Sequence, residues 1–316
     1  MKRTAFVFPG QGSQSIGMGQ EFYEKFDEAR AVYKEASDAL GYDITELCFN
    51  GPKEELNKTF RTQPCLLTTS IAAFKVLQLK GIRPDVVAGH SLGEYSALVV
   101  AGVLSLKDAV VLTEKRGHFM QEAVPEGQGL MAAIIGLDRE VVDRICTNSA
   151  SGYVSAANYN CPEQVVIAGE KLAVEEAIRL AKQEGARRAI ALAVSVPSHC
   201  TLMMSASERL GAYMEGVKFH KPEIPIVNNA DAIVLGTVEK IKSSLVRQLN
   251  SPLLWEDSIR TIAGMDVEVF VEVGPGTVLS GLIKRIDSNV AIYGVNGSAS
   301  LERFLNAQND RQDSKK

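Results

Sequence analysis

The stretch Gly89-His90-Ser91-Leu92-Gly93 constrains the fold of this chain more than any other part of the sequence. An apolar run at 86–88 precedes it and predicts a buried strand, whereas apolar residues at helical spacing follow it. A serine between two glycines at such a junction is typical of a sharp turn, because the turn tolerates only small neighbours. The turn would expose the Ser91 hydroxyl near the N–H groups that open the helix. We therefore interpret Ser91 as a candidate nucleophile rather than an ordinary turn residue.

Strands and helices alternate along the chain on both sides of a central segment. This alternation predicts the α/β class with a mostly parallel sheet. The strands expected in this sheet are residues 4–8, 86–88, 224–227, 267–273 and 290–295. The helices expected around it include residues 22–40, 65–79, 106–121 and 277–286.

The central segment, between Pro125 and Pro197, has a different order of expected strands and helices. It contains expected strands at 130–135, 153–157, 164–168 and 188–194, with helices at 138–149 and 172–184. The order β-α-β-β-α-β is that of a ferredoxin-like unit. We therefore predict a discontinuous catalytic core formed by residues 1–126 and 196–307 and an inserted small domain at 127–195. The polar stretch 308–316 predicts a disordered tail.

Composition excludes several classes of function. The net charge of −4 over 316 residues provides no general attraction to nucleic acid. No apolar run reaches membrane-spanning length, and the run after Met1 ends at Pro9, too early for a signal peptide. Five scattered cysteines without a C-x-x-C pair suit a reducing compartment and argue against a zinc or disulfide framework. We expect a cytoplasmic monomer with no bound metal.

A serine nucleophile needs a base within hydrogen-bond reach, and the chain has four histidines. His90 adjoins Ser91, so its side chain points away from that of the serine. His118 is expected off the apolar face of its helix, and His220 in a charged surface connection. His199 lies at the junction of the two predicted domains, where ligand clefts form. By elimination, His199 is the candidate base.

The residue that orients this histidine is left open by the sequence. Asp231, Asp257 and Asp266 are possible partners, but none is compelling, and a backbone carbonyl can serve as well. Cys200 has no strand-to-helix turn around it, so we interpret it as a small buried residue rather than a thiol nucleophile.

Arg116 falls on the apolar face of the helix expected at 106–121. A buried guanidinium needs an anion or several acceptors. A structural pair with an acidic residue is the ordinary interpretation. Because this helix directly follows the one after Ser91, a substrate anion is the second interpretation.

The loop at residues 8–14 (FPGQGSQ) lacks the third glycine of a dinucleotide fingerprint, and we interpret it as a source of an oxyanion-hole N–H. Together with residues 89–95 (GHSLGEY), Arg116 and residues 197–199 (PSH), it resembles the malonyl-CoA:acyl carrier protein transacylase family. The order and spacing match the stand-alone bacterial enzymes, over about residues 2–307. The resemblance implies a hydrolase-like core with a nucleophile elbow and a ferredoxin-like insertion. It also implies malonyl transfer from malonyl-CoA to the phosphopantetheine thiol of acyl carrier protein, for fatty acid synthesis, without a cofactor.

The resemblance implies roles for single residues. Ser91 would accept the acyl group, His199 would be its base, and Arg116 would pair bidentately with the malonyl carboxylate. Four further substrate contacts would come from the backbone N–H groups of Gln11 and Leu92, which form the oxyanion hole, from Gln248 near the histidine, and from Asn160 in the cleft. A backbone carbonyl near Gln248 would orient His199. The residues at 196–198 have the form usual in the stand-alone enzymes, which indicates malonyl rather than methylmalonyl.

Two other functions stay open. One is a serine thioesterase or hydrolase that uses the same turn, and the other is a non-catalytic module that binds carrier protein. A lipase or esterase needs an apolar acyl pocket, whereas Arg116 favours a dicarboxylic acyl group. The complete set of Ser91, His199 and Arg116 argues against the non-catalytic module.

Acyl carrier proteins are acidic, so a basic docking surface is expected although the chain is net acidic. One candidate is the pair Arg187 and Arg188 with Lys182 one helical turn earlier, and the other is Lys284 with Arg285. Each set is equally consistent with ordinary solvated surface charge.

Overall fold

The computed structural model describes residues 3–192 and 196–313. The strands of its larger sheet are β1 (Arg3–Phe8), β2 (Val86–Gly89), β7 (Ile226–Val227), β8 (Val234–Leu235), β9 (Val267–Val273) and β10 (Ala291–Val295). Their order is β10-β9-β1-β2-β7-β8, and only the last pair is antiparallel. The predicted α/β class with a mostly parallel sheet is confirmed. The short edge strand β8 was not predicted.

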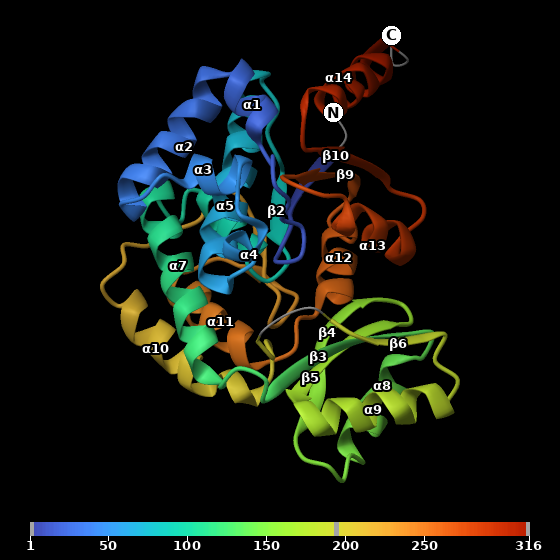
Figure 1. Ribbon diagram of the computed structural model, residues 1–316. Coiled ribbons are helices and arrows are strands. Elements are labelled where there is room, and N and C mark those ends of the chain that lie inside the picture. The colour runs from blue at the N-terminus through green and yellow to red at the C-terminus, as the bar shows by residue number, and fades with distance from the viewer. Residues whose placement is uncertain (1–2, 193–195, 314–316) are drawn as a thin grey trace.

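Helices cover both faces of this sheet (Figure 1). The N-terminal half contributes α1 (Gln20–Lys25), α2 (Asp27–Leu40), α3 (Ile44–Phe49), α4 (Lys53–Leu56), α5 (Thr59–Leu79), α6 (Gly93–Val100) and α7 (Leu106–Ala123). The C-terminal part contributes the 3₁₀ turn η1 (Thr201–Met203), α10 (Met204–Met214), α11 (Val238–Asn250), α12 (Trp255–Ala263), α13 (Val278–Ile286) and α14 (Ser298–Asp313). None of the helices within residues 3–192 and 196–313 has the length and apolar character needed to cross a membrane.

Strand β1 lies inside the sheet and is buried on both faces. Phe6 and Phe8 pack into the cluster that contains α2, α5 and α7. Ala5 and Val7 point the other way, into the cluster that contains α12 and α13. The alternation follows from the two-residue period of a strand, and burial on both faces explains the unbroken apolar run in the sequence.

The second sheet is formed by the inserted segment. Its elements are β3 (Gly129–Ile135), α8 (Arg139–Thr147), β4 (Val154–Cys161), β5 (Gln164–Glu170), α9 (Lys171–Gln183) and β6 (Arg188–Ala191). The strands are antiparallel in the order β4-β5-β3-β6. The predicted sequence of elements is confirmed. The predicted end of the last strand at Val194 lies outside the described residues, and the domain boundaries stay a prediction.

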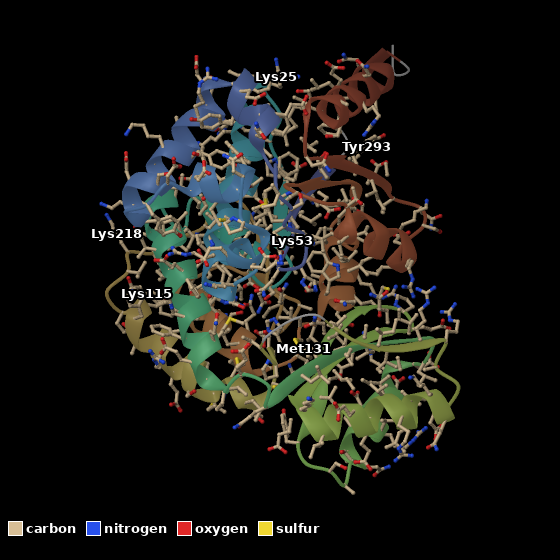
Figure 2. All side chains as sticks on the ribbon, viewed as in Figure 1. Lys25, Lys53, Lys115, Met131, Lys218 and Tyr293 are labelled. Atoms are coloured by element: carbon tan, nitrogen blue, oxygen red, sulfur yellow. The ribbon has the colours of Figure 1, made fainter. Side chains whose placement is uncertain are left out.

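One face of the small sheet is covered by α8 and α9. The other face carries Met131 and Ala168, which pack with Cys200 of the core. Figure 2 labels Met131 where the small sheet meets the larger unit, and Lys115 and Lys218, which are exposed, on the far side of the larger unit. The small sheet thus lies against the larger unit through an apolar contact.

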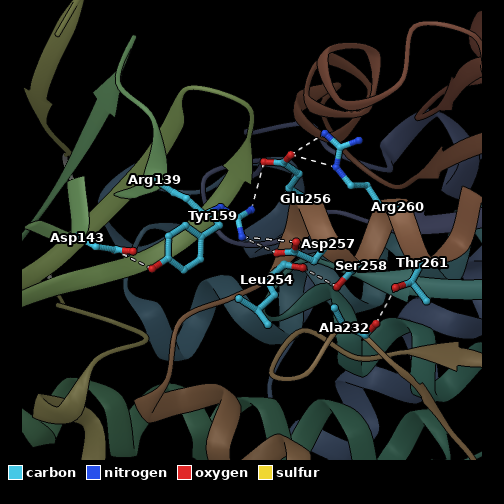
Figure 3. Close-up of polar contacts among 10 residues, drawn as sticks. All are labelled: Arg139, Asp143, Tyr159, Ala232, Leu254, Glu256, Asp257, Ser258, Arg260 and Thr261. Carbon is cyan, nitrogen blue, oxygen red and sulfur yellow. Dashed lines mark hydrogen bonds and ion pairs between the residues drawn. The ribbon is translucent and has the colours of Figure 1, made fainter. Parts of the chain in front are cut away.

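Polar contacts also join the small sheet to α12 (Figure 3). Arg139 of α8 lies 3.2 Å from a carboxylate oxygen of Asp257 and 3.3 Å from one of Glu256. The backbone of Leu253, just before α12, donates to the Ala157 carbonyl and accepts from the Tyr159 N–H of β4. These bonds fix β4 relative to the larger sheet.

The helix predicted at 22–40 was wrong, because two helices replace it. The break is at Phe26, which has an extended backbone with φ −131° and ψ 125°. Phe22 and Phe26 pack edge to face, with ring centroids 5.9 Å apart. Because the apolar spacing continues across the break, periodicity alone did not reveal it. Two short helices, α3 and α4, were missed because they are too short to show a period.

The predicted disordered tail was also wrong in part. Helix α14 continues through position 308 and ends at Asp313. Leu301 and Phe304 are buried and anchor its first turns. Once these turns are formed, the residues that follow, such as Gln308, extend the helix at little cost. Residues 314–316 lie outside the described residues.

Candidate active site

Ser91 lies in the turn between β2 and α6, at the carboxyl edge of the parallel sheet. Its φ is 51°, a left-handed conformation that costs a non-glycine residue about 1–2 kcal/mol. A Cβ on Gly89 would overlap the backbone of Gly93, and a Cβ on Gly93 would overlap the Phe8 carbonyl oxygen. Both glycines are therefore required by close approach of backbone to backbone.

The hydroxyl of Ser91 faces the imidazole of His199. Ser91 Oγ lies 2.9 Å from His199 Nε2, and the histidine is only 3% exposed. On the far side of the ring, His199 Nδ1 lies 2.6 Å from the backbone carbonyl oxygen of Gln248. A carbonyl only accepts, so Nδ1 carries the hydrogen and Nε2 presents its lone pair to the serine.

Burial lowers the pKa of His199 to about 3, and the nearby positive charge of Arg116 acts in the same direction. The bond to the Gln248 carbonyl opposes this shift. The imidazole is therefore neutral at pH 7. A neutral imidazole with a free Nε2 lone pair has the form that a general base requires.

Arg116 lies beside this pair and is 1% exposed. Its Nη1 donates to Gln63 Oε1 at 2.8 Å, and its Nη2 donates to Gln248 Oε1 at 3.0 Å and to Ser91 Oγ at 3.2 Å. All three acceptors are neutral. The guanidinium carbon also lies 5.4 Å from the centre of the Tyr95 ring.

Within the described residues, Arg116 forms no ion pair, and its Nε has no hydrogen-bond partner. The structural pair with an acidic residue, one of the two interpretations of Arg116, is therefore not found there. Glu94 acts on the guanidinium electrostatically without forming an ion pair with it. A desolvated cation whose hydrogen-bond acceptors are all neutral is costly unless an anion joins it. The site has the chemistry to bind a small carboxylate next to Ser91.

The two predicted oxyanion-hole residues lie on adjoining loops. Leu92 follows Ser91 directly, and Gln11 is in the loop after β1, with its side-chain amide 3.3 Å from Thr59 Oγ1. A Cβ on Gly10 would overlap the His90 carbonyl oxygen, so the two loops are in close contact. In the described part of the chain, neither the Gln11 nor the Leu92 backbone N–H has an acceptor. Their role in binding an oxyanion stays a prediction.

Asn160 reaches the site from β4 of the small sheet. Its Oδ1 lies 2.9 Å from Nε2 of His90, whose ring packs edge to face on Trp255 at 5.4 Å. His90 is thus directed at the small sheet and not at the serine hydroxyl. Contact between Asn160 and a substrate stays a prediction.

The remaining histidines and the neighbouring cysteine lie outside this constellation. His118 stacks on Phe60 with ring centroids 4.2 Å apart, and His220 is exposed. Burial raises the pKa of the Cys200 thiol to about 11, so this thiol stays protonated. Its Sγ donates to the Pro197 carbonyl oxygen at 3.2 Å.

None of the three acidic residues considered as partners of His199 is its observed partner. Two of them form ion pairs with arginines, and the third lies in a turn. Asp231 pairs with Arg247, and Asp257 pairs with Arg139. Asp266 has φ 60° at the end of the turn before β9. The bond from His199 Nδ1 to a backbone carbonyl fills the place that an acid would otherwise take.

Three residues near the site were not predicted from the sequence. Gln63 of α5 binds Arg116. Asn229, just after β7, accepts the Ser91 backbone N–H at 2.7 Å. Glu94 of α6 accepts from the Gln248 amide at 2.8 Å. Two signals were available, namely a glutamine within an apolar helix and an asparagine at the carboxyl end of a parallel strand, where ligand sites form.

The described residues contain no group of three or more histidine, cysteine or acidic side chains placed to hold a metal ion.

Comparison with known proteins places the chain in a family. A family model described as "Acyl transferase domain" matches residues 5–305. A malonyl CoA-acyl carrier protein transacylase of Haemophilus influenzae is 50% identical over 311 residues, covering 96% of this chain and 100% of the relative. A solved malonyl CoA-acyl carrier protein transacylase from Clostridium perfringens has a TM-score of 0.96 at 40% identity, covering 99% of both chains.

A further solved relative is a malonyl-transacylase in complex with a holo type II PKS acyl-carrier protein. It is 51% identical, with a TM-score of 0.93, and covers 95% of this chain and 97% of its own. Both the family model and these relatives extend over nearly the whole chain. The chain therefore belongs to the acyl transferase family, and within it to the malonyl CoA-acyl carrier protein transacylases.

Proposed function

We propose that this protein transfers a malonyl group from malonyl-CoA to the phosphopantetheine thiol of acyl carrier protein, through an ester on Ser91. The observation that carries the proposal is the convergence of three groups on one hydroxyl. Ser91 Oγ lies 2.9 Å from His199 Nε2 and 3.2 Å from Arg116 Nη2. A base and a cation thus both contact one nucleophile.

The spacing of these groups fits the size of a malonyl group. One methylene separates its thioester carbonyl from its free carboxylate, so an anchor for the carboxylate has to lie next to the nucleophile. Arg116 meets this requirement, and its neutral partners leave its charge available to the substrate. A guanidinium binds a carboxylate through two parallel hydrogen bonds.

In the first half-reaction, Ser91 Oγ attacks the thioester carbonyl carbon while His199 Nε2 takes the hydroxyl proton. The carbonyl becomes an oxyanion, for which the N–H groups of Gln11 and Leu92 are the proposed donors. Loss of one such donor typically costs about 3–4 kcal/mol of transition-state stabilisation. The carbon–sulfur bond then breaks, and His199 returns the proton to the CoA thiolate.

In the second half-reaction, His199 takes the proton of the phosphopantetheine thiol, whose sulfur attacks the ester on Ser91. The carbon–oxygen bond breaks and the proton returns to Ser91 Oγ, so the enzyme is regenerated. Both half-reactions use one site, and ping-pong kinetics are expected. The proposal needs no cofactor.

Acyl carrier protein as the acceptor is supported by the relative solved in complex with such a protein. Of the two basic sets considered for its docking, several members already have partners. Arg187 pairs with Glu163, and Arg285 donates to Gln164 Oε1 and to the Pro162 carbonyl. The exposed side chains of Lys182 on α9 and Arg188 on β6 are the better candidates in the inserted segment.

We also propose that the protein is a cytoplasmic monomer. All five cysteines are free and buried, which suits a reducing compartment. Residues 1–126 and 196–307 are proposed as the catalytic core, with residues 127–195 as the inserted domain.

The test is to incubate the purified protein with labelled malonyl-CoA in the absence of acceptor and to locate the label by peptide mass spectrometry. Acetyl-CoA and the Arg116→Ala variant are the matched controls. A stable malonyl adduct on Ser91, weak from acetyl-CoA and lost with Arg116→Ala, is the expected result.

The other outcomes separate the alternatives. Rapid release of CoA without an adduct would identify a thioesterase. Neither release nor adduct would leave a non-catalytic module that binds carrier protein.

A further inference from the structure

Glu94 is a buried acid that the proposed chemistry does not use. It lies in the first turn of α6 and is 1% exposed. Its Oε2 accepts from the Gln248 side-chain amide at 2.8 Å and from the Asn229 backbone N–H at 3.0 Å. Its Oε1 has no hydrogen-bond partner among the described residues. The two bonds to Oε2 therefore fix the carboxylate.

Gln248 connects Glu94 to the proposed site. Its Nε2 donates to Glu94 Oε2 and to the Ser91 carbonyl oxygen, at 2.8 Å and 3.1 Å. Its Oε1 accepts from Arg116 Nη2 at 3.0 Å. A guanidinium only donates, so Arg116 requires the oxygen end of this amide. If the amide turned over, its NH₂ group would face the donors of Arg116.

We propose that Glu94 is a positioning residue which, by accepting from Gln248 Nε2, keeps Gln248 Oε1 turned toward Arg116 and so holds the guanidinium where it binds the substrate carboxylate. The inference rests on the carboxylate anchor of the proposed function. It extends that function by adding a residue that acts on acyl selectivity without touching the substrate.

Protonation of Glu94 does not remove this acceptor. Burial raises the pKa of Glu94 to about 7, against the lowering effect of the bonds from Gln248 and Asn229 and of the positive charge of Arg116. A proton carried on the unpartnered Oε1 leaves the lone pairs of Oε2 in place. The positioning effect thus depends on an oxygen acceptor and not on the charge.

The experiment compares acylation by malonyl-CoA and acetyl-CoA in single-turnover measurements of CoA release. Acetyl-CoA has no carboxylate, so the placement of Arg116 affects its rate only through the contact with Ser91 Oγ and the charge near His199, and the effect is expected to be smaller than with malonyl-CoA. Glu94→Met fills the space without an acceptor and is expected to lower the malonyl preference roughly tenfold. Glu94→Gln keeps an oxygen acceptor and is expected to stay within about threefold of the original preference.

A double-variant cycle tests the route. Because Glu94 acts through Gln248, adding Glu94→Met to Gln248→Met should change the preference less than about twofold. A purely structural role would lower both acylation rates together and leave their ratio unchanged, which would overturn the inference. Loss of preference in Glu94→Gln equal to that in Glu94→Met would overturn it as well, because charge would then be the cause.

Circular dichroism melting identifies variants that do not fold. If Glu94→Met does not fold, Gln248→Met removes the same relay and has to lower the preference to a similar extent, and an unchanged ratio would overturn the inference. Arg116→Ala separates the two proposals. If Arg116→Ala leaves the preference unchanged, the proposed carboxylate anchor fails. If it abolishes the preference while Glu94→Met leaves it intact, only the role of Glu94 fails.

Discussion

Ser91 Oγ and His199 Nε2 are 2.9 Å apart although 108 positions separate the two residues in the sequence. The small sheet is built from residues that lie between them. The chain therefore leaves the larger sheet after Ser91 and forms the small sheet. It then returns to the larger unit, where His199 is hydrogen-bonded to Ser91. The hydrogen bond of His199 Nδ1 to the Gln248 carbonyl fixes the ring at this return.

Replacement of His199 by glutamine is expected to slow acylation of Ser91 by about 10²–10⁴-fold, because a general base contributes a factor of this size. Quenched-flow measurement of CoA release checks the rate. Cys200→Ala is the matched control, since the Sγ of this adjacent buried thiol bonds the Pro197 carbonyl, and it should retain the original rate. An equal loss in both variants would assign the effect to local disorder.

Replacement of Arg116 by lysine keeps the charge but removes the planar fork that contacts Gln63 and Gln248. We expect kcat/KM for malonyl-CoA to fall roughly 10–100-fold, because a hydrogen bond to a charged group is worth about 1.5–3 kcal/mol. The rate with acetyl-CoA should fall much less, because it loses only the bond from Arg116 Nη2 to Ser91 Oγ. Steady-state kinetics with both thioesters decide the point, and a parallel loss with both would contradict a carboxylate anchor.

The pH dependence of the free enzyme should reflect the lowered pKa of His199. The acid limb of kcat/KM is expected below pH 6.5, the ordinary value for histidine, because burial and Arg116 disfavour the imidazolium. A bound carboxylate would offset the charge of Arg116 and move the acid limb of kcat to higher pH. Profiles of kcat and kcat/KM from pH 4 to 8 show whether the acid limb of kcat lies at higher pH than that of kcat/KM. An acid limb of kcat/KM above pH 6.5 would contradict the prediction.

The same histidine should affect stability in acid. Its pKa is about 3 when folded and 6.5 as the ordinary value, so the unfolded chain binds the extra proton. Its contribution to stability is present above pH 6.5 and is lost as the pH falls toward 3. His199→Gln should therefore lose stability less steeply in this range, by up to about 1.4 kcal/mol per pH unit. Urea unfolding at several pH values measures the slope, and parallel slopes would exclude the effect.

Gly93 is expected to tolerate no side chain. A Cβ there overlaps the Phe8 carbonyl oxygen, and relief of such overlap typically costs about 1–3 kcal/mol. Gly93→Ala should therefore lower the free energy of unfolding. Gly281 in α13 is the control, because a Cβ there meets no atom within 4 Å, and Gly281→Ala should stabilise the helix by about 1 kcal/mol.

The sequence predicted those features of the site that depend on local pattern. The strand, serine turn and helix around Ser91 are contiguous, and the spacing on α7 placed Arg116 on a buried face. His199 was reached by elimination from its place at a domain junction. These inferences needed no knowledge of which distant residues meet.

The remaining parts of the site depend on contacts between distant segments. Gln63, Asn229 and Glu94 come from three separate parts of the chain. Gln63 and Asn229 lie outside any motif, and the motif at 89–95 did not indicate what Glu94 contacts. The role of each residue depends on its hydrogen-bond partner, and that partner lies far away in the sequence. The break at Phe26 was missed for a related reason, since its packing partner Phe22 lies one turn away and preserves the apolar period.

Strand β1, at the N-terminus, is held between β2 and β9, and its register with β9 joins Ala5 to Phe270 and Val7 to Glu272. During synthesis, β1 is made more than 250 residues before β9, with which one of its edges pairs. Any nascent or truncated chain that stops before Val267 leaves the backbone N–H and C=O groups on that edge of an apolar strand unpaired, and such edges associate with other chains. During synthesis, β1 is thus exposed for a long interval to association with other chains. Truncation of the chain before β9 should yield aggregates rather than a smaller folded unit.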